Sequence, residues 1–370
     1  MAVYKLFPSK DATLYSEYPS MNTGIDEILE MTTLTAKDGI TPEVSRTLVE
    51  FDSTEMNDIK NNLIRTASFA VDLKLNMAKI EGLNHDVDLD VFSLALPWNN
   101  GTGKYLDNPQ TTNGTSWKFT NTSGSTEWIG NIPANATGSY PLSNPGGGCW
   151  WTGSTDGYVL SASATLGYRD ADLDLNFNVT DIFTAWFTES ISNYGFIIKQ
   201  SSSLEFSTDT AYRTELKYFS VDTNTIYPPE LIIKWDDSNY DPGTTVSTSE
   251  LAVSLRNNIG EYYSGSVQRF RVDARPQYPT RTFTTSSLFT TNYSLPESSY
   301  YSVRDLDTNE VVIPFDNTYT KLSADSNGSY FDLYMAGLEP ERYYKIQIKT
   351  TVDNSTLILD DNYYFKVING

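Results

Sequence analysis

The sequence predicts an all-β protein made of two layered β-sheet domains, and two observations lead to this prediction. Several segments place an apolar residue at every second position, which is the pattern of strands with one buried and one solvated face. The composition agrees, because Tyr, Phe and Trp are abundant and charged residues make up only 20% of the chain. A chain of 370 residues is expected to form about two or three domains.

The segment Asp170–Trp186 has the clearest pattern. In its first half, Asp and Asn alternate with apolar residues, which predicts a half-buried strand. The period then becomes helical, and Thr180 or Asp181 is expected to cap a short helix. The apolar residues at helical spacing are Ile182, Phe183, Trp186 and Phe187. The turn Asn193–Gly195 then leads into a second, apolar strand, so a strand, a helix and a returning strand are expected to pack as one unit.

The rest of the first domain, predicted at 1–237, shows the same alternation. A helical turn is expected at 54–59, after a central strand that begins at Ser45. Strands are predicted in chain order at 25–31, 45–52, 67–77, 86–92, 212–219 and 231–235.

Residues 98–157 lose this alternation and are rich in Gly, Asn, Thr, Ser and Pro. A loop region this long in a compact domain usually has a function or holds an insertion. Its tryptophans allow two interpretations: their rings stack on sugars or enter a partner, or they pin the loop onto the sandwich. The candidates for glycan stacking are Trp117, Trp128, Trp150 and Trp151. The glycine run 146–148 lacks the lysine and the helix start of a phosphate loop, which excludes that motif.

A polar segment with Pro and Gly, residues 238–249, is predicted to be a linker. The remaining residues, 250–370, are again rich in strand patterns at the spacing of a sandwich.

Charge and targeting signals narrow the class of protein. The net charge of −21 disfavours nucleic acid as a partner, because phosphate binding depends on Lys and Arg. No apolar run approaches membrane-spanning length, and the N-terminus lacks a signal-peptide pattern. We therefore expect a protein made in a cytoplasm and released by lysis, a class whose main members are parts of virions.

The sequence does not favour catalysis. His85 is the only histidine and Cys149 the only cysteine, so no intrachain disulfide is available and a zinc site has too few ligands. Any Ser-His-Asp or Cys-His mechanism would depend on His85, which sits in a predicted turn. Two carboxylates suffice for a glycosidase, but no pair stands out among 47 acidic residues. The prediction is a protein that is not an enzyme, and polysaccharide hydrolysis remains the third hypothesis for its function.

Two rows of carboxylates lie on single faces of predicted strands. They are Asp86, Asp88, Asp90, Asp170, Asp172 and Asp174. Such rows repel unless they are solvated or bridged by a hard cation, so a wet outer face and a structural Ca²⁺ are both open. Neither row has the glycine and terminal Glu of an EF-hand loop, and no other cofactor is expected.

The first two thirds of the chain resembles the DNRLRE-type jelly-roll modules, some of which are carbohydrate-binding modules. The resemblance rests on the segments DATLYSEYPSMNTGIDEILEM, SRTLVEFD, FNVTDIFTAWF, NYGFIIK and PPELIIKW. The matching positions are Asp11, Asn22, Gly24, Arg46, Phe51, Asp52, Val179, Trp186, Asn193, Gly195, Phe196, Pro229 and Leu231. The resemblance implies an N-terminal jelly-roll β-sandwich. The chain departs from such modules in the region 98–157, which is longer than they usually carry.

In the second domain, the segment LEPERYYKI resembles the tyrosine corner of fibronectin-III and immunoglobulin-like folds, with Tyr344 as the corner tyrosine. This resemblance implies a C-terminal immunoglobulin-like sandwich. The phrases YPTRTFTTSS and SYYSVRDLDTNEVVIPFD are similar to structural proteins of tailed-bacteriophage virions. The implied function is a tail, neck or head-surface component that packs against other virion proteins and copies of itself. The alternative is an adhesin that binds a host surface glycan.

Overall fold

The computed structural model describes residues 2–65, 67–123, 125–130, 132–138, 145–278, 292–361 and 363–370. The prediction of an all-β fold is confirmed, because strands form most of its regular structure and the helices are short. Within these ranges no helix has the length and apolar character needed to cross a membrane. Of the phrase YPTRTFTTSS, only Tyr278 falls within the described residues.

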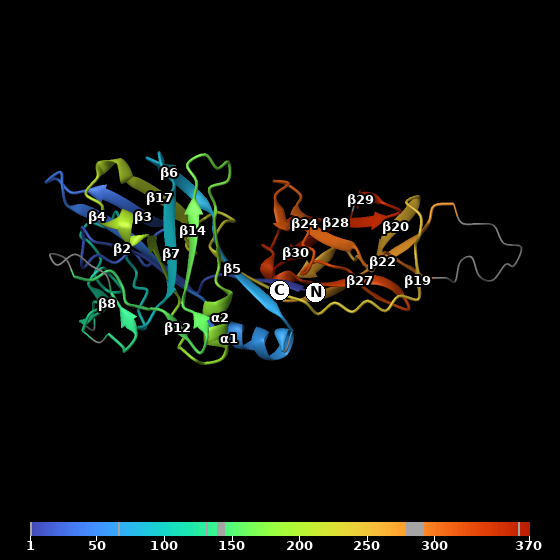
Figure 1. The fold of residues 1–370 in the computed structure, drawn as a ribbon, viewed down its shortest axis with the longest axis horizontal. Helices are drawn as coiled ribbons and strands as arrows, with labels where there is room; N and C mark the ends of the chain where they lie inside the picture. Colours follow the sequence, from blue (N-terminus) through green and yellow to red (C-terminus); the bar gives the residue numbers. More distant parts are fainter. Residues whose placement is uncertain are drawn as a thin grey trace, which may run out of the picture. The chain divides into compact units, whose positions relative to one another are not determined.

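The chain divides into two compact units (Figure 1). The larger unit comprises Leu6–Leu63 and Ala70–Ile232, and the smaller unit comprises Met1–Lys5, Ile64–Phe69 and Ile233–Gly370. The residues predicted as a linker, 238–249, belong to the smaller unit by this division. The domain boundaries inferred from the sequence stay a prediction.

The main sheet of the larger unit has eight strands, in the order β14-β7-β16-β4-β3-β17-β6, with β2 also paired to β4. In that order their bounds are Ser161–Leu166, Val87–Ser93, Phe196–Gln200, Pro42–Glu50, Ile28–Thr35, Thr214–Phe219 and Met77–Glu81, with β2 at Lys10–Tyr15. A four-stranded sheet, β1-β18-β5-β15, comprises Ala2–Leu6, Glu230–Trp235, Phe69–Leu75 and Leu175–Asn178.

Long strands curl the main sheet. The first part of β4 pairs with β3 through Thr33 and Val44, whereas its later residues pair with β2 on one side and β16 on the other. Strands β5 and β6 follow each other across Asn76 and yet join different sheets. The Asn76 side-chain amide donates to the carbonyl oxygens of Tyr227 and Pro228, which fixes this corner.

The predicted strand, helix and returning strand around residue 180 are present, with two corrections. Strand β15 begins only at Leu175, because the preceding aspartates form local turns: the carboxylate of Asp170 accepts from the Gly167 amide and that of Asp172 from the Asp174 amide. Helix α2, Thr180–Phe187, follows Val179, which makes no side-chain cap. Thr180 and Asp181, the predicted caps, do not cap the helix.

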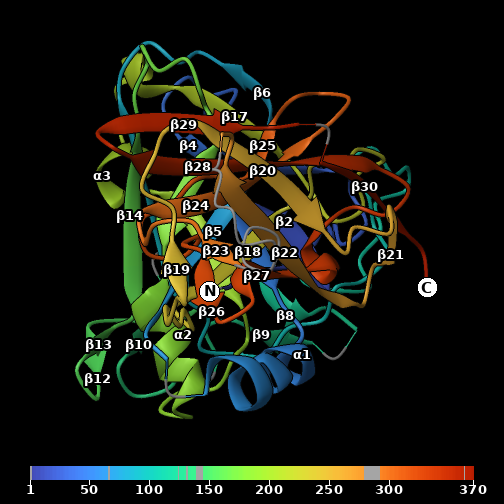
Figure 2. The ribbon, with the colours of Figure 1, turned by 90° about the vertical axis from the view of Figure 1, so that its right-hand side faces the viewer.

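The two residues expected to cap α2 instead tie it to its neighbours. The Thr180 hydroxyl accepts from the Val71 amide at 3.0 Å, and the Asp181 carboxylate accepts from the Val159 amide at 3.2 Å. Helix α1, Ser53–Asp58, is capped by Asp52, confirming the helical turn predicted there. A π-helix, Ile59–Ile64, continues from it, and α1 lies beside α2 (Figures 1 and 2).

The smaller unit is a second sandwich of two six-stranded sheets (Figure 2). One sheet has the order β19-β23-β22-β27-β26 with β20 on β22; its bounds are Thr244–Thr245, Tyr293–Ser294, Val267–Pro276, Gly328–Tyr334, Ser323–Asp325 and Leu251–Arg256. The other has the order β21-β30-β28-β24-β25 with β29 on β28; its bounds are Glu261–Tyr263, Tyr364–Ile368, Tyr343–Val352, Ser299–Asp305, Val311–Ile313 and Ser355–Leu359.

Aromatic side chains fill the core of this second sandwich. The rings of Tyr301 and Phe331, from different sheets, stack with their centroids 4.4 Å apart. The predicted tyrosine corner is confirmed, because the Tyr344 hydroxyl donates to the Glu339 carbonyl oxygen at 3.0 Å.

Gly195, at the start of the returning strand, offers a test of this architecture. It has φ +85°, and a Cβ there would lie 2.3 Å from the Val49 carbonyl oxygen. Gly153 has a similar φ of +76°, but a Cβ at that position would meet no atom within 4 Å. Gly153→Ala should cost about 1 kcal/mol from its backbone conformation alone. Gly195→Ala should cost about 1–3 kcal/mol more, because its Cβ would crowd the Val49 carbonyl oxygen. Urea unfolding measures the free energy of both variants. Equal losses would contradict this account of the turn.

Candidate functional site

Period-two geometry places one set of side chains on the outer face of the main sheet. In β4 these are Val44, Arg46 and Leu48, and in β16 they are Ile197 and Lys199. All five are buried, although a sheet face away from the core is normally solvated. Described residues of the region 98–157, chiefly its tryptophans, cover this face and form a second apolar core with it.

The tryptophans predicted to stack on glycans belong to this second core. Trp117 and Trp128 have no exposed surface and Trp150 is 3% exposed. A ring covered on both faces cannot stack on a sugar, so for these three the structure corrects the glycan hypothesis and places them as the pins that hold the loop region. Trp128 is fixed further, since its indole donates to the Ser116 carbonyl oxygen at 2.9 Å. Only Trp151 is partly exposed.

The small strands of this region are short antiparallel pairs. They are β8 (Phe119–Asn121) with β9 (Thr126–Glu127), β10 (Ala136–Thr137) with β11 (Trp150–Trp151), and β12 (Ser154–Thr155) with β13 (Tyr158–Val159).

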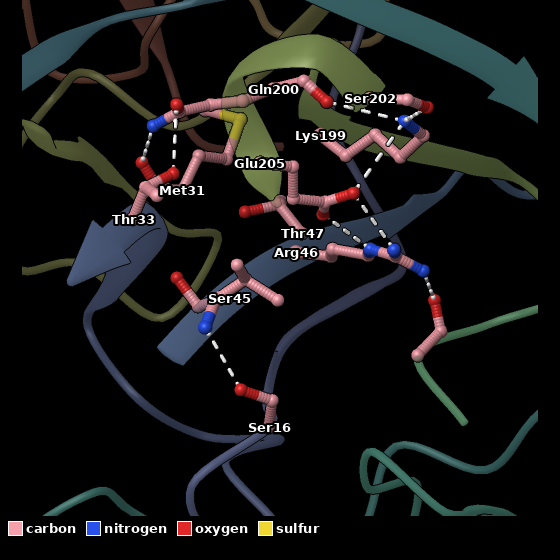
Figure 3. Close-up of polar contacts among 12 residues, drawn as sticks. Ser16, Met31, Thr33, Ser45, Arg46, Thr47, Lys199, Gln200, Ser202 and Glu205 are labelled. Atoms are coloured by element: carbon pink, nitrogen blue, oxygen red, sulfur yellow. Dashed lines mark hydrogen bonds and ion pairs between the residues drawn. The ribbon is translucent and has the colours of Figure 1, made fainter. Parts of the chain in front are cut away.

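Arg46 is the centre of a buried charged cluster between the sheet and the loop region (Figure 3). Its Nε and Nη2 donate to the two carboxylate oxygens of Glu205, at 2.6 and 2.8 Å, as a bidentate pair. Its Nη1 donates to the carbonyl oxygen of Gly147 at 2.5 Å. Its guanidinium carbon lies 5.0 Å from the ring centroid of Trp117 and 5.3 Å from that of Trp150.

Lys199 adds a second buried cation to the cluster (Figure 3). Its Nζ lies 3.7 Å from Glu205 and donates to the Gln200 carbonyl oxygen and the Ser202 hydroxyl. Burial lowers the pKa of Lys199 and the Arg46 charge lowers it further, while the Glu205 carboxylate opposes both. Glu205 ends helix α3, Ser202–Glu205, which follows β16 directly. The Glu205 carboxylate therefore pairs with both Arg46 and Lys199.

The glycine run 146–148, which does not match a phosphate loop, has a structural role at Gly147. The Gly147 carbonyl reaches Arg46 only because the backbone approaches closely: a Cβ there would lie 2.7 Å from both Arg46 Nη1 and the Trp117 ring. Gly147 also has φ +81°, a conformation that favours glycine. The run lets the loop backbone reach a buried guanidinium.

Other positions that carry the jelly-roll resemblance also hold the loop region in place. The Asn22 side-chain amide donates to the carbonyl oxygens of Asn100 and Thr115, and its own oxygen accepts from the Gly103 amide at 2.8 Å. A Cβ at Gly24 would lie 2.0 Å from the Asn100 carbonyl oxygen. The role of these residues in this chain is therefore structural.

The carboxylates of the two rows take part in local contacts with nearby amides, hydroxyls and cations. Asp88 lies in β7 and accepts from the Thr165 hydroxyl; Asp90 lies opposite Lys199 in the ladder; and Asp86 accepts from the Tyr168 amide. In the other row, Asp174 accepts from the Met77 amide and pairs with Lys74 at 3.1 Å, whereas Asp170 and Asp172 close the turns given above. In the part of the chain that the structure describes, no group of three or more Asp, Glu, His or Cys is arranged to hold a metal.

His85 and Cys149 lie in unrelated surroundings. The His85 ring contacts Tyr212, with centroids 4.9 Å apart, and its Nδ1 is 2.6 Å from the Asn84 side-chain oxygen. Cys149 is buried in the tryptophan core, and burial raises the pKa of its thiol to about 11. A thiol that stays protonated at neutral pH is a poor nucleophile.

Sequence reasoning did not single out the Arg46–Glu205 pair, whose members are 159 residues apart. One signal was present. Arg46 stands in the middle of its strand between apolar and hydroxyl-bearing residues, on the face that also carries Val44 and Leu48, and a charged residue there requires a buried partner. The identity of that partner is not encoded locally.

Comparisons with known proteins identify no family. No family model matches the chain, and no curated protein matches its sequence. Among solved structures, a DUF4785 family protein from Legionella pneumophila has 8% identity and a TM-score of 0.19, and the Parabacteroides merdae beta-glucuronidase has 10% identity and a TM-score of 0.20. The alignments cover 100% and 98% of this chain, which spans only 62% and 35% of the length of those proteins. Similarity this low supports no statement about function.

Removing the shared carboxylate tests the buried cluster. Glu205→Gln removes the carboxylate that pairs with both buried cations, so the free energy of unfolding should fall by about 3–5 kcal/mol. The matched control is Glu81→Gln at the exposed Lys79–Glu81 pair, which should lower the free energy of unfolding far less, because water and salt screen exposed charges. Urea unfolding followed by tryptophan fluorescence measures both. Similar losses for the two variants would show that the buried cluster stabilises the fold no more than an exposed ion pair does.

Asp11 makes stability depend on pH. It is 1% exposed in β2, and burial raises its carboxyl pKa to about 8, helped by Asp222 and Asp26 and opposed by a 2.7 Å hydrogen bond from the Val221 amide. Because the folded pKa exceeds the unfolded value of 3.8, the protonated form is favoured by folding. Its stabilising contribution is complete below about pH 4 and is lost as pH rises toward about 8.

Asp11→Asn should therefore flatten the fall in unfolding free energy between about pH 5 and 8, measured by urea titration at each pH. The wild-type slope from this one proton is at most about 1.4 kcal/mol per pH unit. Asp38→Asn is the control, because the exposed Asp38 carboxyl has its pKa lowered by the Thr41 hydroxyl and stays ionised in this range. An unchanged slope in Asp11→Asn would refute the assignment.

Proposed function

We propose that this chain is a non-enzymatic structural protein of a tailed-bacteriophage virion, placed on the tail, neck or head surface, and that it acts by packing against neighbouring proteins. The observation that supports this most is the use of its charged and aromatic residues. Most of the residues that could have formed a site are buried and hold the loop region against the sheet. They are Arg46, Glu205, Lys199 and three of the four candidate tryptophans. What remains for function is the outer surface.

That surface suits association in two ways. The net charge of −21 keeps the free protein soluble and disfavours nonspecific contact. Several large apolar side chains are nevertheless well exposed, including Leu106 at 89%, Ile259 at 79% and Tyr278 at 74%. Apolar side chains of this size gain free energy when a neighbouring subunit covers them. Other virion proteins and further copies of this chain are the proposed partners.

Quantitative mass spectrometry of purified particles tests this function. Particles of the phage that encodes the chain should contain it at a whole-number ratio to a structural protein of known copy number, as symmetric assembly requires. The matched control is the particle-free fraction of the same lysate. A chain that is abundant in that fraction and absent from the particles would refute the proposal.

Binding to a host surface glycan is the second candidate. It is supported only by Trp151, the one proposed stacking residue that is partly exposed, next to the buried Trp150. A glycan array probed with the wild-type chain and with Trp151→Ala separates the two candidates. Hits that are lost in the variant favour glycan binding, and an array without hits eliminates it.

A further inference from the structure

A cavity of about 340 Å³ lies between helices α1 and α2 in the larger unit. Its apolar lining comes from Met56, Phe183, Trp186, Phe187 and Ile191. Its size is at the lower end of the range for ligand sites, roughly 300–1,000 Å³, which suits one large side chain. The adjoining π-helix belongs to a rare class of structure that often marks functional sites.

Next to this cavity the exposed surface of α1 is acidic, whereas the cavity lining itself holds one acid and one base. Glu189 lines it with 85% of its side chain exposed, and Asp52, Glu55 and Asp58 are exposed at or beside α1. Lys60 is the one cation among the lining residues; its Nζ lies 3.8 Å from Glu189 and 5.0 Å from the Phe187 ring centroid. An occupant of matching charge would combine an apolar or aromatic side chain with positive charge nearby.

The chain itself contains a segment with this chemistry. Although 47 of its residues are acidic, the stretch 274–296 contains no Asp or Glu and two arginines. In its described part Arg275 is exposed and Tyr278 is 74% exposed, three residues away. Tyrosine is also among the residues that most often anchor protein interfaces.

We propose that the α1–α2 cavity of one copy receives the side chain of Tyr278 from a second copy, with Arg275 of that copy facing the acidic surface of α1 beside the cavity. Cavity and tyrosine are different surfaces, so the contact is heterologous and builds rings or open chains of subunits. The inference concerns self-association in solution and stands apart from the virion role proposed above.

Sedimentation velocity of the full chain over a concentration series at low salt measures this contact. Wild-type protein should associate, and association should weaken as salt screens the charges. Asn57→Trp, which fills the mouth from an exposed lining position, should raise the dissociation constant at least tenfold. The matched control is Asn62→Trp, an exposed asparagine of the π-helix outside the cavity lining, which should change it less than twofold.

The other side of the contact is tested in the same way. Tyr278→Ser should weaken association at least tenfold, while Tyr263→Ser, at a tyrosine that is 59% exposed, should not. Asp58→Lys and Arg275→Glu should each weaken association, and the double variant should recover part of the loss. Circular dichroism of each variant verifies that the fold is kept.

Three results would overturn the inference. They are a wild-type chain that stays monomeric at every concentration, association that is unchanged by both Asn57→Trp and Tyr278→Ser, and equal effects of the test and control variants. A monomeric chain that is present in particles at a fixed ratio would sink this inference alone. A chain that self-associates as described but is absent from particles would sink only the virion role.

Discussion

The pairing of Arg46 with Glu205 is the interaction on which the larger unit depends. The alternation of β4 directs the Arg46 side chain to the outer sheet face. There the tryptophan region, meaning the described residues of 98–157, covers it. An unpaired charge in that position would cost several kcal/mol, so the fold has to bring a carboxylate and a carbonyl to it. The carboxylate comes from α3 and the carbonyl from Gly147, which joins the sheet, the helix and the loop region at one point.

This constraint explains how the described part of a long polar region is held against the sheet. The described residues of 98–157 have too little regular structure to hold themselves together by backbone ladders, because their strands are only two or three residues long. The buried tryptophan rings and the Arg46 guanidinium that they contact hold these residues against the sheet instead. Asn22 holds the same region at another place, through its hydrogen bond to the Thr115 carbonyl oxygen. The result is a sheet with two cores, one on each face. The molecule's distinctive aromatic residues are thereby used inside it, which leaves association through the outer surface as its proposed role.

The sequence predicted the elements better than their connections. Alternation located β5, β7 and β18 within about two residues at each end, because one buried face imposes a period of two on any sequence that forms it. It failed at Asp170–Asp174, where the same alternation occurs but aspartates bond to nearby amides and form turns. Periodicity does not distinguish a strand from a run of turns that happens to alternate.

The candidate sites were harder to predict because they depend on contacts between distant segments. Tryptophans in a polar loop look the same in sequence whether the loop is free or covered, and only the packing of Trp117 and Trp128 against the sheet decides between the two. The cavity between α1 and α2 likewise joins segments that lie far apart in the sequence. Composition alone did reveal the strongly acidic character of the chain and its single histidine and cysteine.

Hydrogen exchange of the intact protein, read by mass spectrometry segment by segment, tests the central claim most directly. If the tryptophan region is a second core fastened through Arg46, amides in 115–120 and 147–150 should exchange as slowly as those of β4 and β16. Rapid exchange in those two segments, alongside full protection of β4 and β16, would mean that the region is a loosely attached loop and would contradict the account.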